Sequence, residues 1–274
     1  MKLVTLLENT ACAPEFRCAH GLSLYLETPK HKILFDAGPN GDFAANAEWL
    51  GVDLSRVDIA ILSHGHSDHS DGLLTFFRRN DHAKVYVRPA AWDGYYARRE
   101  DGTAYIGLDP ALESYRDRFL PVEGVYAIDE ELTLFPAKGD FPTMDTGARL
   151  KWKNPAGDLV PDPFVHEQDL LISAEGKTVL VAGCAHRGIV NIRRTAEKLA
   201  GRAVDAVVGG FHLFQLDPEK ESSGQLLRTI GQALLPGETV YYTGHCTGEY
   251  VFDALRGILG GRLRGISSGA VIDL

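Results

Sequence analysis

The hydrophobic and polar positions of the first half of the chain predict mainly strands. Five runs of aliphatic or β-branched residues, bounded by Gly, Pro, Asn or Asp, have the length of strands in globular proteins. Helical spacing of apolar residues is limited there to Phe43–Leu50 and Leu73–Arg79. The predicted strands are Lys2–Leu7, Leu22–Glu27, Lys32–Asp36, Val57–Leu62 and Lys84–Val87.

In the second half, strand and helix patterns alternate. Such a mixture favours sheets covered by helices over a helical bundle or a β-sandwich. Because the chain has no linker, low-complexity tract or sequence repeat, we expect a single domain spanning residues 1–274. The predicted strands are Asp169–Ser173, Thr178–Ala182, Ala203–Val208 and Val240–Tyr242, and the predicted helices are Ile189–Leu199, Gln225–Leu235 and Glu249–Leu259.

The segment Arg88–Leu120 has the least regular pattern. One interpretation is a surface excursion with aromatic side chains packed beneath it. The other is a lid or pocket wall, because long loops often carry binding roles. The aromatic residues concerned are Trp92, Tyr95, Tyr96, Tyr105 and Tyr115.

Composition narrows the partners of the protein. The 274 residues include 28 Lys and Arg against 37 Asp and Glu, a net charge of −9, and no basic block. This charge disfavours nucleic acid and anionic membranes as partners.

The N-terminal apolar run Leu3–Leu7 ends at Glu8 and is too short for a signal peptide or a membrane span, so we expect a cytoplasmic protein. Four cysteines in a chain of this length do not make a disulfide scaffold, and the absence of a CxxC pair argues against a zinc ribbon.

The densest group of chemically active residues follows the predicted strand that ends at Leu62. His64 and His66 are two residues apart, so extended backbone directs both imidazoles to the same side. Asp68 and His69 follow as the chain turns into a helix and can serve a second ion. The alternative is a solvated turn. The ordered set H-x-H-x-D-H nevertheless favours a site for divalent metals such as zinc.

Three later strands end in a similar way. In each case one or more small residues after an apolar strand are followed by a possible ligand. These ligands are Cys184 and His186 after the first strand, His212 after the second and His245 after the third. A single histidine of this kind is more often structural than functional. Beside the first cluster, however, His186 and His245 are predicted to be ligands, whereas His212 stays open between the two roles.

These residues resemble a known family. The run His64–His69 resembles the signature of the metallo-β-lactamase superfamily, and Phe35-Asp36-Ala37-Gly38 resembles the aspartate-bearing turn that precedes it. Further marks resemble the subgroup of 7,8-dihydropterin-6-methyl-4-(β-ribofuranosyl)aminobenzene-5′-phosphate synthase-like proteins, and together they span nearly the whole chain. These marks are Glu8-Asn9, His20-Gly21-Leu22-Ser23, Gly183-Cys184-Ala185-His186, Gly209-Gly210-Phe211-His212-Leu213 and His245-Cys246-Thr247-Gly248.

The resemblance implies an α/β fold, the four-layer αββα sandwich. Two mixed sheets face each other, helices cover them, and two divalent metal ions occupy a cleft at one edge. Zinc is the expected metal, with iron or manganese as alternatives. By position, His64 and His66 would bind the first ion, and Asp68, His69 and His245 the second.

The chain departs from the family where Gly183-Cys184 replaces a Gly-Asp pair. The place of that aspartate as a metal ligand is then taken by Cys184 as a thiolate, by His186, or by both residues together. His166, upstream of the same strand, is a further candidate. Cys246 is interpreted as structural, and Cys12 and Cys18 as reduced thiols outside the metal set.

The remaining candidate roles concern the chemistry. Asp36 would position a ligand imidazole or simply cap its turn, and Asp68 would orient a reactive water. His212 would donate a proton to a substrate oxygen. Arg187 would hold a substrate anion or be a surface residue.

The predicted function is that of a metal-dependent hydrolase, or of an enzyme that handles phosphoryl or ribosyl-phosphate groups, acting on a small molecule. A phosphorylated or pterin-like substrate would follow from the subgroup resemblance, with aromatic side chains of Arg88–Leu120 stacking on its ring. Alternatives are a phosphodiesterase, thioesterase or lactonase, an iron-dependent oxidoreductase, and a metal-binding regulatory protein without catalysis. The oligomeric state is left open.

Overall fold

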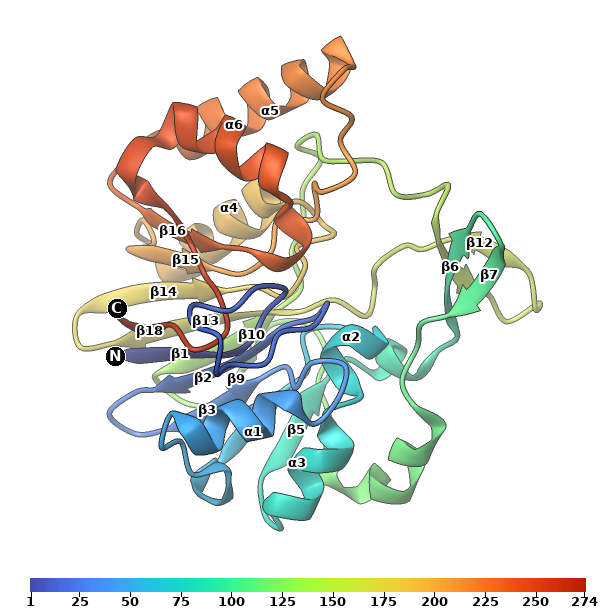
Figure 1. Cartoon of the computed structure of the whole chain (residues 1–274), viewed down its shortest axis with the longest axis vertical. Helices are drawn as coiled ribbons and strands as arrows, with labels where there is room; N and C mark the ends of the chain where they lie inside the picture. The colour runs from blue at the N-terminus through green and yellow to red at the C-terminus, as the bar shows by residue number, and fades with distance from the viewer.

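Two seven-stranded sheets face each other in the computed structural model, which describes residues 1–274 (Figure 1). The first sheet comes from the N-terminal half, and the last strand of the chain joins its edge beside the first strand. In spatial order it consists of β18 (Val271–Asp273), β1 (Lys2–Leu7), β2 (Ser23–Glu27), β3 (Lys32–Phe35), β4 (Ile59–Ile61), β5 (Lys84–Val87) and β8 (Phe119–Pro121).

The second sheet repeats the pairing pattern of the first. Two antiparallel pairings are followed by three parallel ones, both from β1 to β8 and from β10 to β17. This repeat concerns only the order of strand pairings, and the sequence itself contains no repeat. In spatial order this sheet consists of β17 (Leu263–Gly265), β16 (Val240–Thr243), β15 (Ala206–Val208), β14 (Lys177–Val181), β13 (Asp169–Ala174), β10 (Leu132–Phe135) and β9 (Tyr126–Ala127).

Helices cover the outer faces of both sheets, which confirms the expected αββα fold. On the first sheet, α1 (Asp42–Trp49) and α3 (Leu73–Arg79) pack through buried aromatic and aliphatic side chains. On the second, α4 (Ile189–Ala200), α5 (Glu221–Leu234) and α6 (Glu249–Leu259) do the same. None of these helices is long and apolar enough to cross a bilayer. The shorter helices are α2 (Ser67–Ser70), η1 (Leu54–Arg56), η2 (Pro89–Trp92), η3 (Pro110–Arg118), η4 (His245–Thr247) and η5 (Gly260–Arg262).

The layer between the sheets explains why the central strands were predictable. Their side chains are buried on both faces, so the strands form continuous apolar runs. The predicted bounds of β1, β5, α3 and α6 coincide with those observed, and the other predicted elements shift by a few residues.

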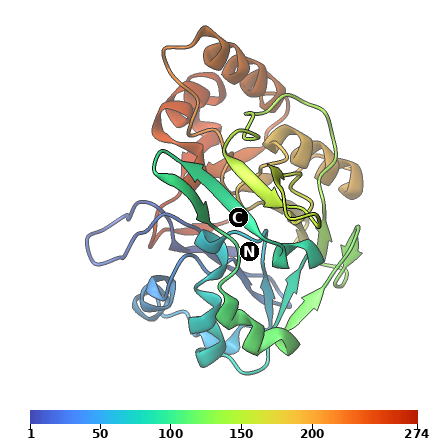
Figure 2. The same ribbon diagram turned by 90° about the vertical axis from the view of Figure 1, so that its right-hand side faces the viewer.

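The segment Arg88–Leu120, whose pattern predicted no helix or strand, is regular in the structure. This segment forms η2, η3 and a hairpin of β6 (Tyr95–Arg99) and β7 (Gly102–Tyr105). The hairpin pairs with β11 (Leu150–Lys153), which pairs with β12 (Leu159–Pro161), to make a third sheet. The pattern did not show this because the partner of β6 lies about fifty residues downstream. The small sheet lies across the edge at which the two large sheets meet (Figure 2).

Candidate metal centre

The residues predicted to bind metals follow the carboxyl ends of strands from both large sheets. Since β3 and β4 run parallel, and β14, β15 and β16 do too, each set of ends meets at one edge of its sheet. Facing sheets bring these two edges together. Asp36 follows β3, His64 and His66 follow β4, Cys184 and His186 follow β14, His212 follows β15, and His245 follows β16.

One group of three imidazoles converges from two sheets. The ring centroids of His64 and His66 are 4.6 Å apart, those of His64 and His186 4.7 Å, and those of His66 and His186 5.0 Å. One ring nitrogen from each lies within 4.8 Å of the others. The Nε2 atoms of all three are buried and have no hydrogen-bond partner. The nearest carboxylate oxygen recorded for the Nε2 of His66 is Oδ2 of Asp162, beyond hydrogen-bond distance at 3.8 Å. Three buried ring nitrogens without a hydrogen bond are a costly arrangement unless a cation lies between them.

Hydrogen bonds on the opposite nitrogens fix two of these rings. The Nδ1 of His64 lies 2.8 Å from the hydroxyl of Ser63, and the Nδ1 of His186 lies 2.9 Å from Oε1 of Glu167. Contacts of this kind set the tautomer and orientation of metal-binding histidines. Burial lowers the pKa of His64 and of His186 well below the usual value, and the pKa of His66 is lowered as well. The neutral imidazoles therefore keep their lone pairs available.

A second group lies beside the first. The Nε2 atoms of His69 and His245 are 3.2 Å apart, and the Sγ of Cys184 lies 3.2 Å from the former and 3.3 Å from the latter. The Oδ2 of Asp68 is 3.7 Å and 3.5 Å from the same two nitrogens. With bonds of about 2.0–2.3 Å, ligand atoms around one tetrahedral ion are separated by roughly 3.3–3.7 Å. The spacing of this group is therefore that of a ligand shell.

Neighbouring side chains also orient the histidines of the second group. The Nδ1 of His69 lies 2.7 Å from Oδ2 of Asp36, and the Nδ1 of His245 lies 2.9 Å from Oδ1 of Asn9. The carboxylate of Glu8 accepts a hydrogen bond from the backbone N–H of His245. Both Nε2 atoms are thereby turned toward Cys184.

The carboxylates and imidazoles of this second group shift one another's pKa values. Burial alone would lower the pKa of His69, but the carboxylates of Asp68 and Asp36 raise it to about 9. Burial would raise the pKa of Asp68, but the nearby imidazoles of His69 and His245 lower it to about 2. Burial lowers the pKa of His245 to about 4. The pair of Asp68 and His69 thus balances its own charge within the protein.

Cys184 lies where the two groups meet. Its sulfur is within 4.8 Å of ligand atoms of His64 and His69, and it forms a further cluster with His186 and His212. Cys184 and His186 were alternatives for completing the site. In the structure both lie close enough to the other candidate ligands to contribute. Burial and the neighbouring Cys246 raise the pKa of the Cys184 thiol well above its usual value, so the thiol carries a proton unless a cation lies beside it.

Two other candidates have their polar side-chain atoms engaged elsewhere. The Nδ1 of His166 accepts a hydrogen bond from the backbone N–H of Gly65 (2.9 Å), and its Nε2 lies 3.1 Å from Asp162. Both ring nitrogens are therefore occupied. The guanidinium of Arg187 donates to the carbonyl of Pro163 and does not line the pocket described below, which agrees with the interpretation of a surface residue.

The cysteines other than Cys184 divide by burial. Cys12 and Cys18 are exposed. Cys246 is buried, accepts a hydrogen bond from the backbone N–H of His212 (3.3 Å), and lies close enough to Cys184 and His245 to share their cluster.

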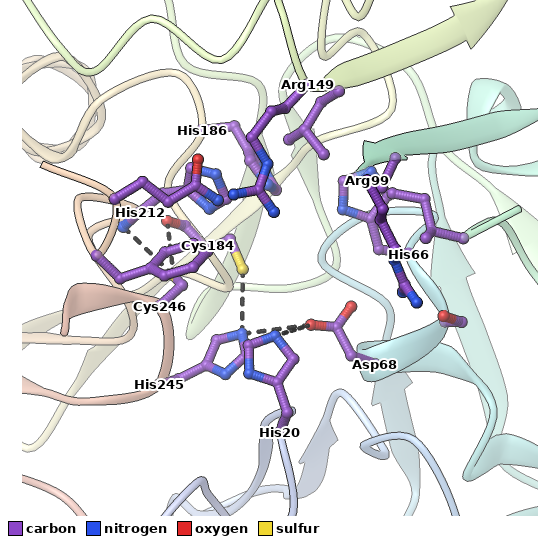
Figure 3. Close-up of a pocket in the computed structure, with 16 residues that line it drawn as sticks. His20, His66, Asp68, Arg99, Arg149, Cys184, His186, His212, His245 and Cys246 are labelled. Atoms are coloured by element: carbon purple, nitrogen blue, oxygen red, sulfur yellow. Dashed lines mark hydrogen bonds and ion pairs between the residues drawn. The ribbon is translucent and has the colours of Figure 1, made fainter. Parts of the chain in front are cut away.

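A cavity of about 180 Å³ opens above both groups. His66, Asp68, Cys184, His186, His212 and His245 line it, and Figure 3 shows them converging from several segments. His212 is buried, and neither of its ring nitrogens has a partner. Both nitrogens are therefore available for a hydrogen bond, and the predicted role of His212 toward a substrate stays a prediction.

Sequence reasoning gave no role to three residues that line this cavity. The Nε2 of His20 lies 3.5 Å from Oδ2 of Asp68, although His20 entered only as part of a family mark. Arg99 and Arg149 reach the cavity from the third sheet and its preceding turn. No local signal marks them, because the third sheet itself was not predicted.

The aromatic side chains of Arg88–Leu120 do not face this cavity. The segment does form a pocket wall, but through Ala97, Arg99 and Ile106. Tyr95 is buried and stacks on His166 with ring centroids 3.9 Å apart. Tyr96 and Tyr105 contact each other with ring centroids 5.4 Å apart, and Trp92 packs on Phe119 at 4.9 Å. None of these rings lines the cavity, so stacking on a substrate ring stays a prediction without support from this geometry.

Comparison with known proteins agrees with this geometry. A family model described as the Metallo-beta-lactamase superfamily matches residues 17–245. The chain belongs to this superfamily.

Two relatives of this superfamily member come from Methanocaldococcus jannaschii. The chain is 30% identical over 271 residues to its 7,8-dihydropterin-6-methyl-4-(beta-D-ribofuranosyl)-aminobenzene-5'-phosphate synthase, covering 90% of this chain and 88% of the relative. It is 32% identical over 221 residues to the uncharacterized protein MJ0448, covering 76% of this chain and 78% of that protein.

Solved structures show the same fold. Tm1679, described as a metal-dependent hydrolase of the beta-lactamase superfamily, matches with a TM-score of 0.81 and 26% identity, covering 100% of this chain and 99% of the other. Zn²⁺-bound PqqB from Methylobacterium extorquens matches with a TM-score of 0.56 and 14% identity over 100% of both chains, a likeness in fold alone.

Proposed function

We propose that this protein is a metal-dependent enzyme that holds two divalent ions and hydrolyses, or transfers a phosphoryl group of, a small molecule. The observation that carries the proposal is the set of three buried Nε2 atoms without hydrogen-bond partners on His64, His66 and His186. A protein without metal gains nothing from this arrangement, since each unpaired buried atom costs about 1–3 kcal/mol.

The candidate ligands at this site are of the types that bind divalent metal ions intermediate between hard and soft, such as zinc. Imidazole nitrogens with one carboxylate and one thiolate favour zinc, with iron or manganese as alternatives, over magnesium. The first ion would be held by His64, His66 and His186, and the second by Asp68, His69 and His245, with Cys184 between them.

Paired divalent ions, when bound, lower the pKa of a water molecule from about 15.7 toward about 7 and so supply a nucleophile at neutral pH. The remaining work falls to the chain's own side chains. Asp68 presents a carboxylate oxygen to the cavity and orients the reacting group. His212, with both nitrogens free, donates a proton or a hydrogen bond to a substrate oxygen. His20 lies beside Asp68 and is sufficiently exposed to exchange protons with solvent.

The names of two similar proteins narrow the proposed substrates. The synthase from Methanocaldococcus jannaschii is named for a phosphorylated pterin product, and Tm1679 is described as a hydrolase. Both names are compatible with chemistry at a phosphate centre. We therefore rank phosphate esters as substrates ahead of thioesters and lactones.

The first test is metal content. Protein purified without a metal-affinity column should contain close to two ions per chain, measured by elemental analysis. The double variant His64→Ala/His66→Ala should lose at least one ion, whereas His82→Ala, which removes an exposed histidine that does not line the cavity, should lose none. A parent protein with less than about half an ion per chain would contradict the proposal.

The second test is turnover of the loaded protein on phosphomonoester, phosphodiester, thioester and lactone substrates. Activity that disappears on treatment with a chelator and in the double variant, and that persists in His82→Ala, supports a catalytic site. Two bound ions with no turnover on any substrate would instead favour a metal-binding protein without catalysis.

A further inference from the structure

The third sheet places two cationic side chains on the wall of the cavity. Ala97 and Arg99 are two residues apart on β6, so their side chains project from the same face of the strand. The backbone N–H of Arg98 donates to the carbonyl of Arg149 at 2.8 Å, which brings the start of β11 beside β6. Arg99 and Arg149 both line the cavity, and Figure 3 shows their guanidinium groups directed into it.

Neither guanidinium has a partner within the protein. No hydrogen bond or ion pair joins the side chain of Arg99 or Arg149 to any other residue. Several other arginines are engaged: Arg118, for example, donates to backbone carbonyls, and Arg193 to Tyr241 and Leu234. Both side chains are exposed, so water solvates them while the cavity is empty. What sets them apart from other exposed arginines is that both line the same cavity as the candidate metal ligands, where two cations without a counterion favour an anionic ligand.

The wall between the two cations is apolar. Ala97 and Leu150 are paired across the sheet, and together with Ile106 they line the same side of the cavity. Phe214 lines it as well. A ligand that fits this surface has an apolar or aromatic body in addition to its anionic group.

Two guanidinium groups, one from β6 and one from the turn before β11, suit phosphate better than carboxylate. One arginine fork already occupies both oxygens of a carboxylate, whereas a phosphate monoester has three terminal oxygens that can accept from both forks. The only carboxylate that lines the cavity is Asp68, and its Oδ2 already lies 3.5 Å, 3.7 Å and 3.5 Å from ring nitrogens of His20, His69 and His245.

We infer that Arg99 and Arg149 bind a phosphate group of the substrate and thereby select organic phosphate esters with an apolar body. This inference rests on the proposed function for the position of the reaction, and it deepens that proposal by assigning substrate recognition to the third sheet. Arg99 and Arg149 act here as specificity-determining residues.

The test uses phenyl phosphate as the probe and isothermal calorimetry as the readout, with both metal-loaded and chelator-treated protein. The variants Arg99→Gln and Arg149→Gln should each weaken binding about tenfold or more, since each removes charge-assisted hydrogen bonds. Arg98→Gln is the matched control, because it removes the same charge from the adjacent, oppositely directed position on β6. It should leave the dissociation constant within about twofold. Metal content should be unchanged in all three variants.

The outcomes separate this inference from the proposed function. Weaker binding in Arg99→Gln and Arg149→Gln but not in Arg98→Gln supports it, even where the protein turns over no substrate. Equal effects in all three variants, or none, would overturn it while leaving metal content and activity as independent evidence on the enzyme. Benzoate that binds as tightly as phenyl phosphate and depends equally on both arginines would overturn the preference for phosphate. For a substrate found by screening, the two variants should raise KM more than they lower kcat.

Discussion

Asp36 and His69 are 33 residues apart in the chain, yet Oδ2 of Asp36 lies 2.7 Å from Nδ1 of His69 where both are buried. The same carboxylate accepts hydrogen bonds from the backbone N–H of Ser63 (2.8 Å) and from its hydroxyl (2.6 Å), and that hydroxyl contacts His64. One buried aspartate therefore orients a histidine of each candidate metal group.

Replacing this aspartate should weaken both metal positions. Asp36→Asn keeps the shape but leaves only one acceptor oxygen for three donors. We expect metal affinity to fall about 10- to 100-fold and the free energy of unfolding of the metal-free protein to fall by about 2–3 kcal/mol. Competition with a chelating dye and urea denaturation measure the two effects. Asp81→Asn, at an exposed position, should change neither, and an Asp36→Asn protein with unaltered metal affinity would refute this role.

Cys184 and Cys246 offer a matched pair of substitutions. In protein loaded with Co²⁺, a thiolate ligand gives a charge-transfer absorption. We expect Cys184→Ser to remove this band and to lower the affinity for one ion, because its sulfur lies 3.2 Å and 3.3 Å from the Nε2 atoms of His69 and His245. Cys246→Ser should retain the band. If the band persists in Cys184→Ser and vanishes in Cys246→Ser, the ligand assignment is reversed.

Gly183 is required by the close approach of β14 to the loop after β4. A Cβ at this position would lie 2.2 Å from the hydroxyl oxygen of Ser63 and 3.2 Å from Nδ1 of His64. Gly183→Ala should therefore displace Ser63, lower metal content, and destabilise the protein by about 1–3 kcal/mol. Gly257→Ala, in α6 with open space around its Cβ, should instead stabilise the protein by up to about 1 kcal/mol. Thermal denaturation and elemental analysis compare the two variants, and equal behaviour would contradict the steric argument.

His31 joins the two halves of the fold at a position remote from the site. Its Nδ1 lies 2.7 Å from Asp58 and its Nε2 lies 2.7 Å from Asp129. Partial burial lowers the pKa of His31, but the two carboxylates outweigh this effect and raise it above the usual value of 6.5. A raised pKa in the folded state means that the folded protein binds more protons than the unfolded chain between 6.5 and the raised value.

The stabilisation from His31 is therefore complete below pH 6.5 and is lost as the pH rises through its folded pKa. We expect His31→Gln to be destabilised relative to the parent at pH 6, by no more than about 1 kcal/mol because the pair is partly exposed. The difference should shrink as the pH increases toward 9. Urea denaturation at several pH values measures it, and a difference that grows with pH would have the wrong sign.

The sequence by itself predicted sheets covered by helices and marked most of the candidate ligands, and its resemblance to a family supplied the four-layer arrangement. Central strands buried on both faces are apolar along their whole length, and so they are visible without knowledge of their partners. The spacing of His64, His66, Asp68 and His69 likewise reflects local backbone geometry, which any chain with that pattern shares.

Only the tertiary structure showed which further side chains lie beside these candidate ligands and which residues line the cavity next to them. Whether His166 or His186 has a free nitrogen depends on Asp162 and Glu167, whose proximity no local pattern encodes. The third sheet depends on pairing between segments about fifty residues apart, so the positions of Arg99 and Arg149 over the cavity were also hidden. Local periodicity records how a segment is buried, whereas the identity of its neighbours is a property of the folded chain as a whole.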